Sequence, residues 1–278
     1  MELTLPRAAE RRSGLQRGRR ETLGLMLLAL PMLLFLGLPL LALVFRLRPL
    51  SLVESLSNAA VAQALYLSLT TTALSTVVAV VFGTPLAYLL ARRDFRGRAI
   101  VDTLVDLPMV LPPSVAGIAL LIAFGRRGLV GGYLDTIGLS LAFSQTAVVM
   151  AQVFVAAPFF IKAAVSGFAG VDRDLEQAAA IDGAGSWRIF RHITTPLAWT
   201  VLLGGMMMTW ARALGEFGAT IIFAGNLPGR TQTMPLAIYL GYELNLNVAL
   251  TLSVILMATS FLVLFVVKRL LRQRLGVV

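Results

Sequence analysis

Six long uncharged runs of mainly apolar residues, separated by short charged segments, dominate the pattern of the chain. A helix of about 20 apolar residues crosses a hydrocarbon core of about 30 Å, and the shortest of these runs holds 19 residues. Backbone N–H and C=O groups must be paired inside lipid, which favours helices for such segments. The pattern therefore predicts an all-α integral membrane protein with six transmembrane helices, at residues 22–45, 55–91, 107–125, 136–161, 193–211 and 244–267.

The first two runs carry features that refine this prediction. The run 22–45 is longer than the apolar core of a signal peptide, which has about 7–15 residues, so we expect it to be retained as a span. The run 55–91 holds 37 residues, more than one straight span needs. We expect Ser57 and Asn58 to cap its helix, and Pro85 to kink the helix near its end.

Composition supports a membrane protein and excludes several other classes. The chain is 58% hydrophobic and 14% charged, whereas soluble domains average about 45–50% and about 25%. A soluble enzyme, a disordered chain and a coiled coil are therefore disfavoured. Cysteine is absent and His192 is the one histidine, which excludes disulfides, thiolate sites and a multi-histidine metal cluster. The net charge of +10 does not indicate nucleic-acid binding, because the arginines cluster at the ends of apolar runs.

Lys and Arg residues are distributed unevenly between alternate loops. The two terminal segments and the loops after the second and fourth runs hold 18 of them, Lys162 included, whereas the other loops hold five. Cytoplasmic loops carry an excess of Lys and Arg, so both termini are predicted to be cytoplasmic. The expected organisation is a basic cytoplasmic tail at 1–21, a six-span membrane domain at 22–267 and a second basic tail at 268–278.

The loop at 167–195, between the fourth and fifth spans, contains residues that are typical of the beginnings and ends of helices. Asp172 and the acids that follow it favour a helix N-terminus, and Gly183 is a natural stop. Ser186 is expected to cap a second short helix, and Pro196 to open the fifth span. A short helix with a small-residue face fits a groove on another protein, but it could equally be a plain link between two spans.

The stretch 177–196 resembles the cytoplasmic signature of ABC importer permeases: Glu-Ala-Ala, three residues, Gly, nine residues, Ile, one residue, Leu-Pro. The spacing fits throughout, but Gln177 stands where Glu is usual and Thr195 where Leu is usual. Glu176 is the candidate replacement for the missing carboxylate. The resemblance implies the type I permease fold and a coupling helix held in a cleft of the ATPase subunit. The implied coupling residues are Glu176, Gln177, Ala178, Ala179, Ala180, Asp182, Gly183, Ala184, Ile193 and Pro196.

The stretch 211–235 is similar to the oxyanion branch of these permeases, which handles molybdate, tungstate and sulfate. The Gly-Glu-Phe-Gly-Ala-Thr run at 215–220 and the run at 225–233 are nearest to molybdate permeases. The resemblance implies a homodimer in membrane lipid, two ABC ATPase subunits and a periplasmic or extracellular molybdate-binding protein, with no nucleic acid. No phosphate-binding G-x-x-x-x-G-K-[ST] loop is present, so ATP and Mg are expected on the partner ATPase and no cofactor on this chain.

Charges and prolines at membrane depth give a second group of candidates, for the translocation pathway or its gate. Arg212 and Glu216 are four residues apart and are expected on one helical face, either as a buried structural pair or on the substrate route. Prolines at the start of the third run leave backbone carbonyls without a hydrogen-bond donor. Such a backbone is compatible either with pore lining or with a packing kink. The candidates are Pro112, Pro113, Ser114, Arg212, Gly215, Glu216, Gly218 and Thr220.

The leading hypothesis is the permease subunit of an ATP-driven molybdate or tungstate importer. A sulfate or thiosulfate permease of the same kind is the nearest alternative. A secondary transporter driven by an ion gradient would need paired repeats and midplane sites, and no convincing repeat is visible. A membrane protein of assembly or signalling is a further alternative, which lacks transport.

Overall fold

The computed structural model describes residues 7–46 and 58–275. The chain divides into two compact units, Met1–Pro49 and Leu50–Val278. In the first unit, helix α1 spans Arg7–Phe45 and contains an apolar segment, Gly24–Phe45, that is long enough to cross a membrane. The predicted first span is thus helical, and the helix also includes most of the segment expected to be a tail. Residues 1–6 of that tail lie outside the described ranges.

The second predicted run forms one helix, α3, over Ala59–Arg92. The side chain of Asn58 accepts a hydrogen bond from the Ala60 N–H at 2.9 Å, which confirms the predicted cap. Ser57, the other expected cap residue, lies outside the described residues. The helix continues through Pro85 and ends where Arg93 becomes extended.

The predicted third span at 107–125 is not one continuous helix, and its break falls at the prolines of the run. Helices α4 (Arg98–Val110) and α5 (Pro113–Phe124) meet at an angle of 117°. Leu111 is extended, because α geometry is disfavoured before proline, and Pro112 and Pro113 have no N–H to continue a helix. The 12 residues of α5 span only about 18 Å, so the apolar run is a broken element.

The fourth helix is displaced along the chain from the predicted 136–161. Helix α7 spans Gln145–Ala169, with the Ser144 side chain accepting from the Ala147 N–H. Its start is delayed because a short helix, α6 (Gly131–Thr136), and a loop occupy the beginning of the apolar run. Its end is extended because Asp102 and Asp106 of α4 neutralise Lys162, so this charge does not end the helix.

The C-terminal half contains the predicted fifth and sixth spans and two short helices that were not expected. Helix α13 (Leu246–Leu275) begins two residues after the start of the predicted run 244–267 and includes most of the predicted tail, of which residues 276–278 lie outside the described residues. Within residues 7–46 and 58–275, five helices are long and apolar enough to cross a membrane, or six if the bent pair counts as one span. The remaining elements are α8 (Arg173–Ile181), α9 (Ser186–Ile189), the π-helical turn η1 (Phe190–Thr194), α10 (Thr195–Leu214), α11 (Gly218–Phe223), α12 (Met234–Leu244) and α13 (Leu246–Leu275).

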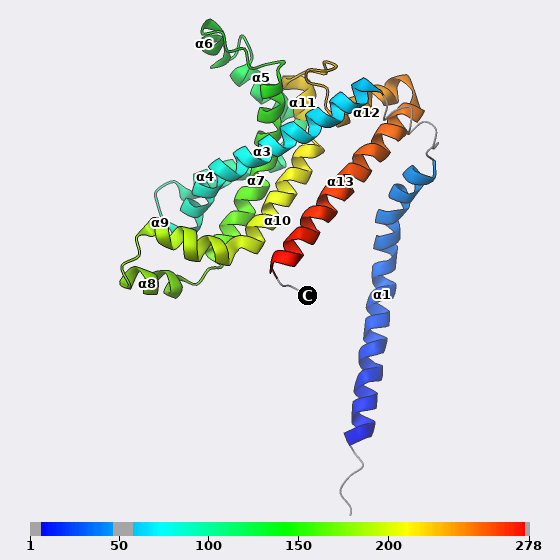
Figure 1. The fold of residues 1–278 in the computed structure, drawn as a ribbon, viewed down its shortest axis with the longest axis vertical. Coiled ribbons are helices and arrows are strands. Elements are labelled where there is room, and N and C mark those ends of the chain that lie inside the picture. The colour runs from blue at the N-terminus through cyan, green and yellow to red at the C-terminus, as the bar shows by residue number, and fades with distance from the viewer. Residues whose placement is uncertain (1–6, 47–57, 276–278) are drawn as a thin grey trace, which may run out of the picture. The chain divides into compact units, whose positions relative to one another are not determined.

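Helix α7 is the central element of the second unit and packs against α3 and α10 on its two sides (Figure 1). Phe160 and Phe168 of α7 are fully buried in one cluster with Leu90 of α3 and Leu202 of α10. Toward its N-terminus, α7 packs against α5 and α11 around Phe223. A third cluster joins α3 to α12 and α13. Helix α7 therefore packs against α5 and α11 at its N-terminal end and against α3 and α10 toward its C-terminal end.

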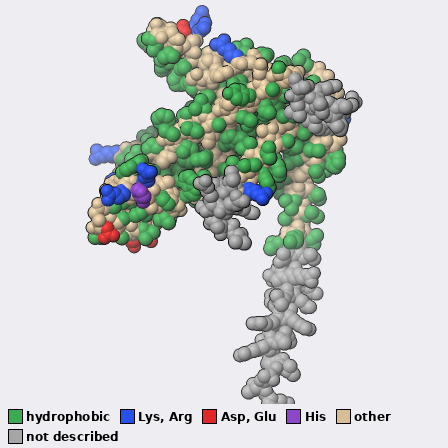
Figure 2. Space-filling model, in the orientation of Figure 1, with side chains coloured by type: hydrophobic (Ala, Val, Ile, Leu, Met, Phe, Trp, Pro, Cys, Tyr) green, Lys and Arg blue, Asp and Glu red, His purple; other side chains and the backbone are tan. Residues whose placement is uncertain are grey.

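A buried polar seam joins α3 and α7. The hydroxyl of Ser75 donates to Gln152 Oε1 at 2.9 Å, and the Gln152 amide lies 3.5 Å from Thr72 Oγ1. Figure 2 shows apolar side chains over the middle of the molecule on the face in view, with charged side chains gathered at the α8–α9 end and around α6. This distribution is typical of a helical bundle whose middle lies in lipid and whose ends lie in water.

Candidate functional site

The residues 172–194 form a compact segment between two membrane helices, here named the coupling segment. The Asp172 side chain caps α8 by accepting from the Asp174 N–H at 2.9 Å. Gly183 has φ +87°, a conformation that L side chains rarely adopt, and the chain reverses there. The predicted helix and its stop are confirmed. The predicted cap at Ser186 is wrong: Gly185 holds the cap position and Ser186 is the first residue of α9.

Helix α8 projects from one end of the bundle (Figure 1), and none of its residues is buried. Ala178 and Ala180 are exposed and Ala179 is half-buried, which leaves a face of methyl groups. Large apolar side chains flank this face: Ile181 is 86% exposed and Trp187 is 70% exposed. Small residues beside exposed apolar groups are typical of a helix that docks into a groove of another protein.

Glu176 attaches α8 to the bundle, and Gln177 does not. A Glu176 carboxylate oxygen lies 3.2 Å from the Arg92 guanidinium at the end of α3, and the Thr194 hydroxyl donates to the same oxygen at 2.5 Å. Arg92 also donates to the Val171 carbonyl at 2.8 Å. Gln177 is exposed. The acid one residue before the usual signature position therefore makes the local ion pair, and Arg92 is a site residue that the sequence did not single out.

Replacing Arg92 with Met is expected to loosen the coupling segment from the bundle. The Arg92 side chain is 7% exposed, so its loss leaves Glu176 without its counter-charge and the Val171 carbonyl without its side-chain donor, at a cost of about 1–3 kcal/mol. Hydrogen exchange over 171–194 should rise about tenfold or more, since about 1.4 kcal/mol corresponds to a factor of ten. The control is Arg93→Met, at the exposed neighbouring position. Equal exchange in both variants would contradict the assignment of Arg92 as the attachment.

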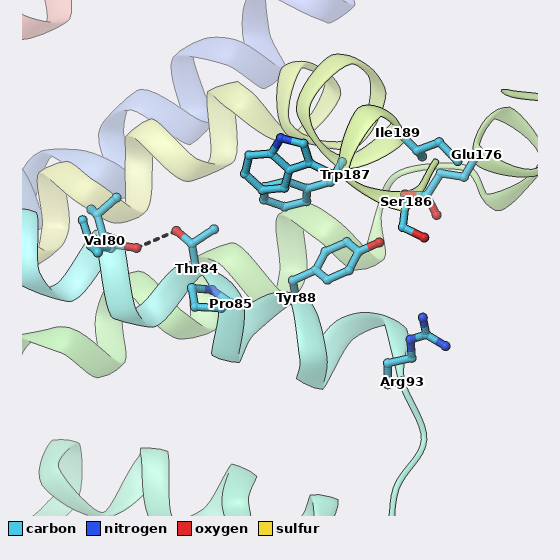
Figure 3. A pocket seen from close by; sticks show the side chains of 11 residues that line it. Val80, Thr84, Pro85, Tyr88, Arg93, Glu176, Ser186, Trp187 and Ile189 are labelled. Atoms are coloured by element: carbon cyan, nitrogen blue, oxygen red, sulfur yellow. Dashed lines mark hydrogen bonds between the residues drawn. The ribbon is translucent and has the colours of Figure 1, made fainter. Parts of the chain in front are cut away.

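The coupling segment and α3 line an open cavity of about 650 Å³ (Figure 3). Figure 3 shows Tyr88 of α3 between the apolar end of the cavity, at Val80 and Thr84, and its polar end, at Glu176. The Phe190 ring packs edge-on against Tyr88, with centroids 5.1 Å apart. The contact between η1 and this part of α3 is thus an aromatic pair.

The residues predicted for the translocation pathway or its gate lie where the bend between α4 and α5 meets the break between α10 and α11. This region is here named the helix junction. Arg212 lies in α10, but α10 ends at Leu214, so Glu216 is in the following turn and the expectation of one shared helical face is wrong. Gly215 at the C-cap ends the helix before Glu216. The ion pair is nevertheless formed: Arg212 Nη1 and Glu216 Oε2 are 2.9 Å apart. Glu216 is 1% exposed, and its other oxygen accepts from the N–H of Ala219 in the first turn of α11 at 2.8 Å.

The junction brings part of the predicted proline cluster against α11. A Cβ added at Gly218 would lie 2.8 Å from Pro113 Cβ and 3.3 Å from Ser114 N, so only glycine allows this approach. Thr220 is fully buried, and its hydroxyl has no hydrogen-bond partner in the described part of the chain. Pro112 marks the bend between α4 and α5, and Gly215 is exposed on a groove with Phe217 and Tyr239.

A charge cluster between α4 and α7 was not predicted from the sequence. Lys162, counted above as a loop charge, lies inside α7, and that earlier placement is wrong. Its ammonium group lies 2.8 Å from Asp102 Oδ1 and 2.9 Å from Asp106 Oδ2, both on α4. The available signal was the spacing of the two acids, four residues apart and therefore on one face of a helix. The cluster holds the first half of the bent pair against α7.

Three comparisons place this geometry among known proteins. A family model described as "Binding-protein-dependent transport system inner membrane component" matches residues 79–277. The chain is 40% identical over 205 residues to the putative molybdenum transport system permease protein YvgM of Bacillus subtilis (strain 168), covering 73% of this chain and 90% of that protein. It is 41% identical over 233 residues to the molybdenum transport system permease protein ModB of Mycobacterium tuberculosis (strain ATCC 25618 / H37Rv), covering 83% and 88%.

The fold is also similar to a solved structure. The crystal structure of a bacterial ABC transporter involved in the import of the acidic polysaccharide alginate matches with a TM-score of 0.72 and 16% identity, covering 95% of this chain and 99% of that chain. At this identity the likeness concerns the fold alone. The helices described above therefore have the arrangement found in permease chains of ABC importers.

Proposed function

The chain belongs to the family of binding-protein-dependent transport system inner membrane components, and from this membership we propose that it carries molybdate, or tungstate, into the cytoplasm. It is a multi-pass membrane chain of an ABC importer and not the ATP-hydrolysing subunit. The substrate assignment rests on the identity of 40–41% to molybdenum permeases over most of the chain. The runs 215–220 and 225–233 add to it, because they resemble the molybdate branch.

The proposed assembly contains two copies of this chain around one route, two ATPase subunits and a soluble molybdate-binding protein. ATP and Mg bind to the ATPase subunits. Each ATPase holds one coupling segment through the exposed methyl face of α8. Closure of the ATPases displaces α8, and the displacement reaches the bundle through the Arg92–Glu176 ion pair and the Tyr88–Phe190 contact. The helix junction at Pro112–Ser114 and 212–220 is the proposed gate or pathway wall.

Uptake by a reconstituted complex tests this function. Vesicles containing this chain and its ATPase, supplied with the binding protein and ATP, are expected to accumulate molybdate or tungstate, with sulfate in modest excess competing poorly. The substrates are dianions of one shape class, so the selectivity could come from the binding protein. A sulfate-loaded binding protein is therefore exchanged for the molybdate-loaded one. Equal uptake from both partners would contradict a substrate-specific permease and favour an unselective oxyanion route.

A purification experiment separates the importer from the other classes. An ATPase and a binding protein are expected to co-purify with the chain when all are expressed together. Uptake that follows an ion gradient and needs no ATP would instead indicate a secondary transporter. Absence of both ATPase association and uptake would favour an assembly or signalling protein.

A further inference from the structure

A cavity of about 490 Å³, whose lining includes both polar and apolar side chains, lies at the end of the bundle opposite the coupling segment. It opens between the first turns of α3 and α7, and Gly229 of the loop between α11 and α12 also lines it. Helix α7 connects this end to α8 over its 25 residues, about 37 Å. The polar side chains of the lining come from two helices and are Gln63, Tyr66, Thr70, Thr71, Gln145 and Thr146.

Four of these side chains offer hydrogen-bond donors that the bundle does not use. Gln63, Tyr66, Gln145 and Thr146 are exposed, and none makes a side-chain hydrogen bond with another residue in the described ranges. The Thr70 and Thr71 hydroxyls, in contrast, donate to carbonyls of α3. The amide and hydroxyl groups of the four exposed side chains are therefore available to a polar occupant of the cavity.

The chemistry of the lining favours an anion with several oxygens. Amide N–H and hydroxyl groups donate to such oxygens, and hydrogen bonds to a charged acceptor are about twice as strong as neutral ones. No carboxylate is among the residues that line the cavity. The first residue of α7 is Gln145, so the partial positive charge of that helix end also faces this region.

The loop that resembles the molybdate branch reaches the same cavity. A Cβ added at Gly229 would lie 3.2 Å from Gln63 Oε1, so the loop backbone packs against the Gln63 amide. Arg230 follows in the loop and is exposed. Within the loop, Thr231 Oγ1 accepts from the Leu227 N–H at 3.0 Å, and the Gln232 amide donates to Asn226 Oδ1 at 3.0 Å. The loop is therefore held in shape beside the free donors of α3 and α7.

We propose that this cavity is an oxyanion subsite of the transport route, where neutral donors on α3 and α7 bind the tetrahedral dianion. The proposal rests on the proposed function and specifies where this chain itself contacts the substrate. It also assigns the substrate contact to neutral side chains, away from the Arg212–Glu216 pair of the helix junction.

Replacing Gln145 with Glu tests the subsite. The carboxylate is nearly isosteric with the amide but repels a dianion, so molybdate uptake with saturating loaded binding protein should fall about tenfold or more. An acid in the first turn of a helix stabilises that helix, so the thermal stability of the variant should be unchanged or higher. Gln145→Leu, which removes the donors without adding charge, should reduce uptake less than Gln145→Glu does.

The matched control is Asn247→Asp. Asn247 is the second residue of α13 and is exposed, so this change introduces the same charge in the first turn of another helix. Uptake by this control should stay within about twofold of the unmodified complex. Unchanged uptake by Gln145→Glu, or an equal loss in both variants, would overturn the subsite. Failure of the unmodified complex to take up any oxyanion would instead contradict the proposed function, whereas sulfate uptake leaves the subsite testable with the same variants.

Discussion

Replacing Ala178 with Trp is expected to abolish ATP-driven uptake while the chain remains folded. Ala178 is exposed, and no residue of α8 is buried, so the indole meets only solvent in the isolated chain. In the proposed assembly the same side chain would separate the methyl face of α8 from the ATPase groove, because close helix docking needs small residues at the contact. Co-purification of the ATPase and molybdate uptake by vesicles should both fall to background.

The control for this experiment is Leu139→Trp, which adds the same ring at a position 54% exposed in the loop after α6. That loop lies at the end of the second unit opposite α8 (Figure 1). Thermal unfolding and size-exclusion profiles of both variants should match those of the unmodified chain. Normal ATP-driven uptake by Ala178→Trp would show that the coupling assignment is wrong.

The coupling segment could be predicted from the sequence because its structure is determined by neighbouring residues. A cap residue such as Asp172 satisfies backbone groups two residues away, and Gly183 takes a conformation that other residues avoid. Such signals act within a few positions, so they are readable in one sequence. The partner of Glu176 was not readable in this way, because Arg92 lies on a helix far away in the sequence.

Helix boundaries within apolar runs were less predictable for a different reason. Hydropathy reports that a segment can lie in lipid or in a core, but not where its helix begins. Residues 137–144 are mostly apolar and nevertheless form the loop before α7. Conversely, Lys162 does not end α7, because Asp102 and Asp106 supply its counter-charge. The cavity between α3 and α7 was also invisible at the sequence level, since its donors come from separate helices.

The Arg212–Glu216 pair gives the second large expected effect, on stability. Glu216→Ala leaves Arg212 without its partner and the Ala219 N–H without its acceptor, at a residue that is 1% exposed. Breaking a fully buried pair costs about 3–5 kcal/mol; because the Arg212 side chain is 29% exposed, we expect a loss at the lower end of this range. The unfolding transition in detergent, followed by heat or denaturant, should show a loss of this size.

The double variant Arg212→Met with Glu216→Gln distinguishes a structural pair from a pathway role. It removes both charges, and the Gln amide oxygen can still accept from the Ala219 N–H that Glu216 now binds. Because replacing both members of a buried pair is often nearly neutral, the double variant should recover most of the stability that Glu216→Ala loses. A double variant as unstable as Glu216→Ala would refute the coupling of the two charges. If the recovered double variant takes up molybdate normally, the pair is structural only; if it is folded but inactive, the Arg212 charge acts on the substrate route.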